Sequence, residues 1–328
     1  MSAVPGAVTG QQVTGLHHVS VLSGEPQETL DFYVGVLGMR LVKRTVNQDA
    51  PSMYHLFFAD GAGTPGTELT FFPWPRGLPG RRGTGVPTEV SLAVPEGALQ
   101  AYWAERLAQH GVRAAEETRF GERALVFADP HGLGLALVET GAAREFVAWD
   151  DSPVPAAYQV RGLHAVRLDV PALDLTAAFL DRALGFAPLA SEGAWTRYGV
   201  QGGGSGRVVD VCERPDAARA TGGVGSVHHV AFRVPDDAAE LAQRERVVAA
   251  GGRPTEVIDR FWFRSVYFRE PGGILYELAT DGPGFAVDEK PGELGERLVL
   301  PPFLESRRAE IVRRLPAVRV PVPRPAGV

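Results

Sequence analysis

A short phrase with two adjacent histidines occurs twice in this chain, about two hundred residues apart. Gly15-Leu16-His17-His18-Val19 stands near the N-terminus, and Val227-His228-His229-Val230 opens the last quarter. A third copy, Gly162-Leu163-His164-Ala165-Val166, keeps only the first histidine. A repeated segment indicates one structural unit that is used several times. Histidines at equivalent places in two copies are candidates for holding one metal ion, because imidazole is the commonest metal ligand in proteins.

A landmark shared by the copies aligns the units. The dipeptide Val-Pro ends the first apolar run in three of them, and six positions before its proline lie, in chain order, Glu89, Ala165 and His229. The first unit reaches His18 in the same register. On the last hairpin, Glu277 lies six positions after Pro271, where the second unit has Ala136. The predicted metal ligands are therefore His18, His229 and Glu277, the two-histidine, one-carboxylate set of non-haem Fe(II) oxygenases.

Only one histidine of each pair is expected to face this metal, because neighbours in a strand point to opposite faces of the sheet. The register selects the second member of each pair. His17 and His228 are then expected on the opposite face or at the rim of the site. Three other histidines fall outside the register, and we expect them to be structural or at the surface: His55, His110 and His131.

The elements that must position these residues follow one order in each unit. An alternating apolar run is followed by a helix-like stretch and then by further strands, which predicts strand, helix and three strands, four times over. The predicted helices cover residues 29–37, 98–110, 174–184 and 238–250. One such unit cannot bury both faces of its sheet, so the units must pair. The expected fold is α+β, with four βαβββ modules paired into two domains.

The expected boundaries follow from a proline-containing stretch in the middle of the chain. We expect an N-terminal pair of modules with the first histidine ligand, a linker, a C-terminal pair with the second histidine and the glutamate, and a separate tail. These are residues 14–141, 142–160, 161–284 and 285–328.

Composition limits the classes of partner. The 328 residues suffice for two domains, and the net charge of −6 argues against a general binder of nucleic acid. No apolar run approaches the length of a membrane-spanning helix, and the first twelve residues do not read as a signal peptide. The single Cys212 fits a reducing compartment, so a cytoplasmic location is expected. The open sheet edges and the basic tail suggest a homodimer.

Further motifs carry a family resemblance. They are Val42-Lys43-Arg44-Thr45, Tyr54-His55-Leu56-Phe57-Phe58-Ala59-Asp60, Gly63-Thr64-Pro65-Gly66-Thr67, Asp259-Arg260-Phe261-Trp262-Phe263 and Ser265-Val266-Tyr267-Phe268-Arg269-Glu270-Pro271-Gly272-Gly273. With the histidine pairs and the repeated units, they resemble the vicinal oxygen chelate superfamily, which includes glyoxalase I, bleomycin-resistance proteins and extradiol dioxygenases. Over roughly residues 14–305 the chain is most similar to hydroquinone-type ring-cleaving dioxygenases.

This resemblance implies a cofactor, substrates and roles for further residues. Fe(II), or Mn(II) in some members, is held by the three ligands named above. The substrates are O2 and a small aromatic of the hydroquinone or catechol type. His17 and His228 match histidines beside the substrate, Tyr267 matches a tyrosine that faces the ring, and Arg260 matches an arginine of the pocket. These four are the predicted catalytic residues.

Two other functions remain open at this point. A glyoxalase-like isomerase or lyase has a fourth ligand, a carboxylate on the last strand of the first unit. Glu68 is the candidate, but the position six after Pro65 is Phe71, so Glu68 is expected to be out of register and exposed. A metal-free binding protein of the resistance type has no need of the two histidines and the glutamate.

Overall fold

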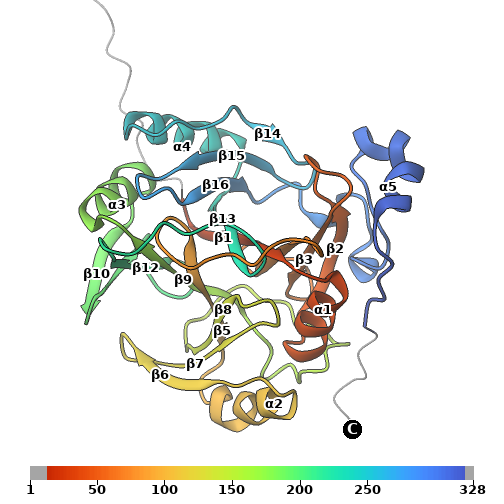
Figure 1. Cartoon of the computed structure of the whole chain (residues 1–328), viewed down its shortest axis with the longest axis horizontal. Coiled ribbons are helices and arrows are strands. Elements are labelled where there is room, and N and C mark those ends of the chain that lie inside the picture. Colours follow the sequence, from red (N-terminus) through yellow and green to blue (C-terminus); the bar gives the residue numbers. More distant parts are fainter. Residues whose placement is uncertain (1–12, 322–328) are drawn as a thin grey trace, which may run out of the picture.

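The computed structural model describes residues 13–321, which form two eight-stranded sheets (Figure 1). In sheet I the strand order is β14-β15-β16-β13-β1-β4-β3-β2. In sheet II it is β10-β11-β12-β9-β5-β8-β7-β6. Each sheet contains two modules with one strand, a helical segment and three strands. The expected α+β class with four βαβββ modules is confirmed.

The modules have these bounds. Module 1 comprises β1 (Gly15–Ser23), α1 (Pro26–Leu30), η1 (Asp31–Val36), β2 (Arg40–Val46), β3 (Tyr54–Ala59) and β4 (Glu68–Pro73). Module 2 comprises β5 (Pro87–Val94), η2 (Leu99–Trp103), α2 (Ala104–Gln109), β6 (Ala115–Arg119), β7 (Glu122–Ala128) and β8 (Gly134–Glu139). Module 3 comprises β9 (Gly162–Val170), α3 (Leu173–Phe179), η3 (Leu180–Leu184), β10 (Ala187–Glu192), β11 (Trp195–Gly199) and β12 (Val208–Glu213). Module 4 comprises β13 (Ser226–Val234), α4 (Asp237–Ala249), β14 (Ile258–Asp259), β15 (Arg264–Arg269) and β16 (Leu275–Thr280).

The sheets do not join modules that are neighbours in sequence. β1 pairs antiparallel with β13, so module 1 shares sheet I with module 4. β5 pairs antiparallel with β9, so modules 2 and 3 share sheet II. This corrects the expected pairs within 14–141 and 161–284. Each first strand pairs in parallel with the last strand of its own module and leaves one edge open, and alternation of apolar residues does not specify which module fills that edge. The linker bounds 142–160 stay a prediction.

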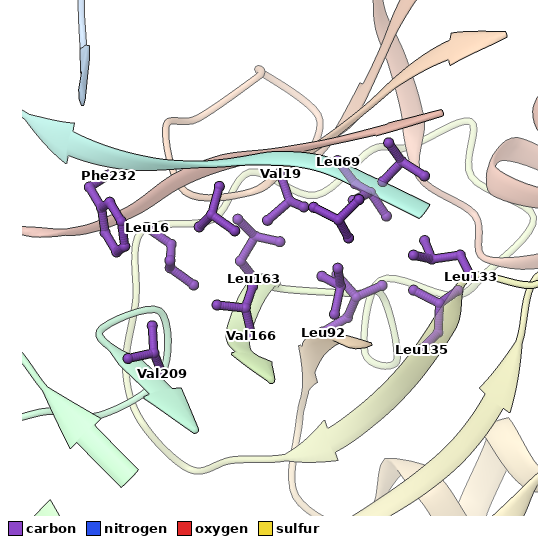
Figure 2. Packing of buried hydrophobic residues seen from close by; sticks show 14 of the residues in the cluster. Leu16, Val19, Leu69, Leu92, Leu133, Leu135, Leu163, Val166, Val209 and Phe232 are labelled. Atoms are coloured by element: carbon purple, nitrogen blue, oxygen red, sulfur yellow. The ribbon is translucent and has the colours of Figure 1, made fainter. Parts of the chain in front are cut away.

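The main hydrophobic core contains side chains from both sheets. Leu16 and Val19 of β1 and Leu69 of β4 lie on one side of it, and Leu163 and Leu92 of sheet II lie on the other (Figure 2). All five are buried. The alternate residues of each first strand therefore point away from this core. In sheet I that opposite face carries His18, and we call it the site face.

Each pair of first strands contains two β-bulges, where one strand has an extra residue. In sheet I, Leu16 pairs with Phe232 and His18 with Ala231, so His17 is the extra residue. A second shift in the same pair of strands makes His228 extra. The equivalent bulges of sheet II have His164 and Thr88 as the extra residues. The bulges are thus a shared property of the scaffold, with or without a metal site.

The C-terminal segment packs against sheet I through a buried lysine. It contains η4 (Phe285–Val287), η5 (Pro291–Glu293), η6 (Pro302–Arg307) and α5 (Arg308–Arg314). The ammonium of Lys43 on β2 forms ion pairs with Asp288, at 2.7 Å, and with Glu289. Trp262 Nε1 donates to Asp288 Oδ1 at 3.2 Å. The tail therefore fixes Trp262 as well as the strand. Among residues 13–321, no helix is long and apolar enough to cross a membrane.

Candidate metal centre

Three donor atoms meet on the site face of sheet I. His18 Nε2 lies 3.2 Å from His229 Nε2 and 3.2 Å from Glu277 Oε2, and His229 Nε2 lies 2.8 Å from the same carboxylate oxygen. Metal–ligand bonds of about 2.1 Å at right angles place neighbouring donors about 3.0 Å apart. The three atoms therefore fit one face of an octahedral divalent metal ion. All three side chains are buried.

The protonation states of these groups also fit a metal. Burial alone raises the pKa of Glu277, but His18 and His229 hold it well below its usual range. Burial lowers the pKa of His18 to about 4. Ser265 Oγ donates to Glu277 Oε1 at 2.5 Å and fixes the carboxylate. Its Oε2 lies next to both imidazoles and has no other hydrogen-bond partner among residues 13–321. An ionised, buried oxygen with this environment is suited to a cation.

His17 and His228 lie beside the donors, not across the sheet from them. His17 Nδ1 is 3.0 Å from His18 Nδ1, and His228 Nδ1 is 2.7 Å from His229 Nδ1. The expectation that they occupy the opposite face is therefore wrong, whereas His228, which is exposed at the cavity, lies at the rim of the site. Simple alternation fails here because each is the extra residue of a bulge, which turns two successive side chains to one side. The contact leaves Nε2 of His18 and of His229 free for a metal, with Nδ1 of each as the donor to its neighbour.

Glu68 is buried, contrary to the expectation that it is exposed. Its exposed fraction is 1%, and its Oε2 lies 3.0 Å from His17 Nδ1. His17 Nε2 is 3.2 Å from the carbonyl oxygen of Thr280. Glu68 pairs in register with His18, whereas the position equivalent to Glu277 is Thr70. The glutamate thus shares the site face but contacts His17 instead of the three donors.

A cavity of about 300 Å³ opens beside the donors. Its apolar lining residues are Phe57, Phe72, Trp262, Phe263 and Leu275. Its polar lining residues, besides His18 and His229, are Asn47, Gln48, Asp49, His55, His228, Arg260 and Tyr267. The cavity therefore combines flat apolar walls with polar groups, and the side of the metal position that the protein leaves open faces a space of small-molecule size.

The model of the Glyoxalase/Bleomycin resistance protein/Dioxygenase superfamily matches residues 15–137 and 162–278. The chain belongs to this superfamily. The two matched stretches cover the four modules, and the superfamily's name includes both isomerases and dioxygenases, so membership alone leaves the reaction open.

Close relatives of this superfamily member are named for ring cleavage. MhqA of Bacillus subtilis (strain 168), named as a ring-cleaving dioxygenase, is 42% identical over 94% of this chain and 100% of its own length. The chlorohydroquinone/hydroquinone 1,2-dioxygenase of Sphingobium indicum is 36% identical over 93% of this chain and 97% of its own length. A crystal structure from Bacillus subtilis, 40% identical, has a TM-score of 0.89 and covers 95% of this chain and 99% of that one. Glyoxalase I of Zea mays, 17% identical with a TM-score of 0.61, covers 81% and 92% and shares the fold.

Tyr267 and Arg260 both line the cavity. The ring of Tyr267 is 5.6 Å from that of His229, edge to face. Burial and Glu277 raise the pKa of Tyr267, so its phenol stays a hydrogen-bond donor. Arg260 lies over this ring at 5.5 Å, and its Nη2 is 3.0 Å from Asp49 Oδ2. Phe261 between Arg260 and Trp262 has a φ of 75°, a left-handed conformation that lets the turn present both neighbours to the cavity.

His55 also lines the cavity, which sequence reasoning missed. It lies on β3 two residues before Phe57, so both side chains are on the site face. The register of the histidine pairs could not find it, because no other module repeats a histidine on its third strand. The signal that could have found it is alternation along β3, once β3 is known to lie in the sheet of the donors. His110 and His131 are absent from this lining.

Proposed function

We propose that this chain is an Fe(II)-dependent dioxygenase that cleaves the ring of a hydroquinone-type aromatic with incorporation of O2. The observation that carries the proposal is the convergence of three buried donors, His18, His229 and Glu277, beside an aromatic-walled cavity. Three protein ligands on one face leave positions for a substrate oxygen and for O2. The names of MhqA and of the Sphingobium hydroquinone dioxygenase support the same reaction.

The metal, when bound, would favour the phenolate form of a substrate hydroxyl and supply electron density to O2. The chain's own residues do the remaining work. Phe57 and Phe263 keep water from the ring. Burial and His229 lower the pKa of His228, which is exposed to the cavity, to about 4, so its imidazole is neutral. Since its Nδ1 accepts from His229, its Nε2 carries the hydrogen and donates a hydrogen bond to a substrate oxygen. Tyr267 donates a hydrogen bond to a substrate oxygen, and Arg260 keeps that phenol in place.

His17 acts through His18. It accepts from Nδ1 of His18 and thereby fixes the imidazole with Nε2 toward the metal. Thr280 O contacts Nε2 of His17, and Glu68 Oε2 lies beside the same Nδ1 that faces His18. We assign His17 a positioning role, because the residues that hold it are distinct from those of the cavity lining.

Dioxygen uptake tests the proposal. Protein loaded with Fe(II) without air is offered hydroquinone, methylhydroquinone, chlorohydroquinone and catechol in air-saturated buffer. The expected result is one O2 per ring with a new ring-opened chromophore, faster with the hydroquinones than with catechol. Uptake by none of the four, from protein that holds one metal per chain, contradicts the proposal.

One observation favours a second function, a glyoxalase-like isomerase or lyase. Glu68, the candidate for a fourth ligand, is buried and forms a donor cluster with His17 and His18. Its pairing with His17 argues for the dioxygenase, because a fourth carboxylate on the metal would occupy a position that O2 needs. Turnover of a glutathione hemithioacetal without O2 consumption, lost in Glu68→Gln, would establish the second function instead.

A further inference from the structure

His55 is held between two aromatic rings on the wall of the cavity. Its ring centroid is 3.9 Å from that of Phe57 and 4.2 Å from that of Phe72. Phe57 follows on the same strand, and Phe72 lies on the neighbouring strand β4. A polar ring in an apolar wall is held at a defined orientation, since both faces are covered by carbon.

One ring nitrogen of His55 forms a hydrogen bond within the protein and the other does not. Nε2 is 3.0 Å from Thr70 Oγ1, which is 2.7 Å from Ser20 Oγ. Nδ1 has no hydrogen-bond partner among residues 13–321, and it is not fully buried. Since the residue lines the cavity, this nitrogen is open to whatever the cavity holds. Burial lowers the pKa of His55 well below its usual range, so the ring is neutral and offers one N–H or one lone pair there.

His55 lies at the far end of the cavity from the metal position. In the order β13-β1-β4-β3, its strand is two places from the strand of His18, which corresponds to about 10 Å. Phe72 links the two places on one side, with its ring 5.6 Å from that of His228. Phe263 links them on the other, 6.4 Å from Phe57 and 5.4 Å from His18. If a substrate ring binds at the donors through one hydroxyl and lies between these walls, the opposite side of the ring is near His55.

We propose that Nδ1 of His55 hydrogen-bonds the substrate hydroxyl that is remote from the metal. This inference rests on the proposed function and deepens it, because it names the recognised substrate as a para-diol. A monophenol has no second hydroxyl to reach His55. Catechol has one, but both of its hydroxyls lie at the metal end. His55 therefore selects the diol by the position of its second oxygen and takes no part in holding the metal.

Binding without O2 tests this proposal independently of turnover. Fe(II)-loaded protein is titrated calorimetrically under nitrogen with hydroquinone and with phenol. We expect hydroquinone to bind about tenfold more tightly in the parent protein, since one hydrogen bond contributes about fivefold and the two equivalent hydroxyls about twofold. In His55→Phe, which keeps the stacked ring, the preference should fall to about twofold, because hydroquinone still offers two equivalent hydroxyls to the metal. The affinity for phenol should stay within about twofold.

A second variant distinguishes loss of the hydrogen bond from loss of packing. His55→Asn keeps a polar atom near the place of Nδ1 and should restore part of the preference for hydroquinone over phenol. An unchanged preference in His55→Phe overturns the proposal. So does an equal weakening of both ligands, because His55 then only packs. Failure of the ring-cleaving function would look different: the parent protein would bind both ligands under nitrogen and consume no O2 in air.

Discussion

The two sheets have the same architecture, but only one of them has the donors for a metal. In sheet I the residue directly after the extra residue of each bulge is a histidine, His18 or His229. In sheet II the same positions are Ala165 and Glu89, and Ala136 stands in place of Glu277. The bulges are retained in both sheets. The scaffold therefore supplies the geometry, and three side chains decide whether it becomes a metal centre.

In sheet II, arginine side chains supply the positive charge that a metal ion would supply in sheet I. Arg119 Nη1 lies 2.5 Å from Glu89 Oε1, and its Nη2 lies 3.1 Å from Glu89 Oε2. Arg197 Nε is 2.7 Å from Asp210 Oδ1, and its Nη1 is 2.5 Å from Glu122. A carboxylate that takes the place of a metal-binding histidine is thus neutralised by a side chain of the same chain. A covalently fixed cation gives a closed, inert site, whereas a bound ion leaves coordination positions for substrates.

Removing the carboxylate of sheet I should have the largest effect on function. Glu277→Ala takes away one of three donors, and we expect metal affinity to fall by more than about 100-fold, since even partners outside the ligand set contribute 10–100-fold. Metal content after dialysis and dioxygen uptake measure the effect. Far-ultraviolet circular dichroism should stay native. A variant that retains one metal per chain and full activity would contradict the assignment of Glu277.

Removing Glu89, the carboxylate of sheet II, should lower the stability of the protein and leave its metal content unchanged. Glu89→Ala leaves the buried guanidinium of Arg119 with Glu117 alone, and we expect a loss of about 3 kcal/mol in the free energy of unfolding. Urea denaturation measures it. Metal content should stay at the parental value, and Glu89→Gln should lose less stability because the amide oxygen still accepts a hydrogen bond. If Glu89→Ala lost its metal while its stability stayed unchanged, the contrast between the sheets would be refuted.

Helix α4, which packs against sheet I, carries the unpaired carboxylate of Glu240. Glu240 is fully buried, and its carboxylate oxygens have no hydrogen-bond partner among residues 13–321. Burial raises its pKa to about 7. The folded state thus binds its proton more tightly than the unfolded state, so stability falls as the pH rises from about 4.5 to 7.

Glu240→Gln should remove this loss. We expect the variant to be more stable than the parent at pH 8, on the order of 1–3 kcal/mol, and equal to it at pH 4.5. Urea denaturation at both pH values checks this. Glu245→Gln, an exposed position on the same helix, is the matched control and should follow the parent at every pH. A pH-independent difference for Glu240→Gln would count against the buried charge.

The smallest effect is expected at the cavity rim. The Asp49 side chain is 75% exposed and pairs with Arg260, which is 15% exposed. Pairs of this kind contribute about 0.2–1 kcal/mol. Asp49→Asn should therefore raise KM for hydroquinone by no more than about fivefold and leave the metal content unchanged. Initial rates at low and high salt measure this, and the difference from the parent should shrink at high salt. A larger change in kcat than in KM would place Asp49 in the chemistry.

The three donors could be predicted because the repeated segments align equivalent positions of the modules. The Val-Pro landmark fixed His229 relative to Glu89 and Ala165, and the structure brings His18, His229 and Glu277 together on one face. The order of elements within a module could be predicted for a similar reason, since apolar periodicity and glycine stops are local signals.

Three features could not be predicted, and each depends on a pairing between distant strands. The side on which His17 lies depends on a bulge that forms only when β1 meets β13. The burial of Glu68 follows from its parallel register with His18. The place of His55 at the cavity requires β3 to lie two strands from β1. Local sequence specifies the module, but partner choice and register arise from tertiary structure.

The pairing of module 1 with module 4 imposes an order on biosynthesis. Sheet II draws all its strands from residues 87–213, so the middle of the chain can complete its hydrogen-bonded ladders while the ribosome is still at work. β1 emerges first, yet its antiparallel partner β13 follows about two hundred residues later. Sheet I must therefore close around an already folded centre from both ends of the chain. A metal ion at this site would then be the last component to bind, because a nascent chain that ends before β16 lacks Glu277.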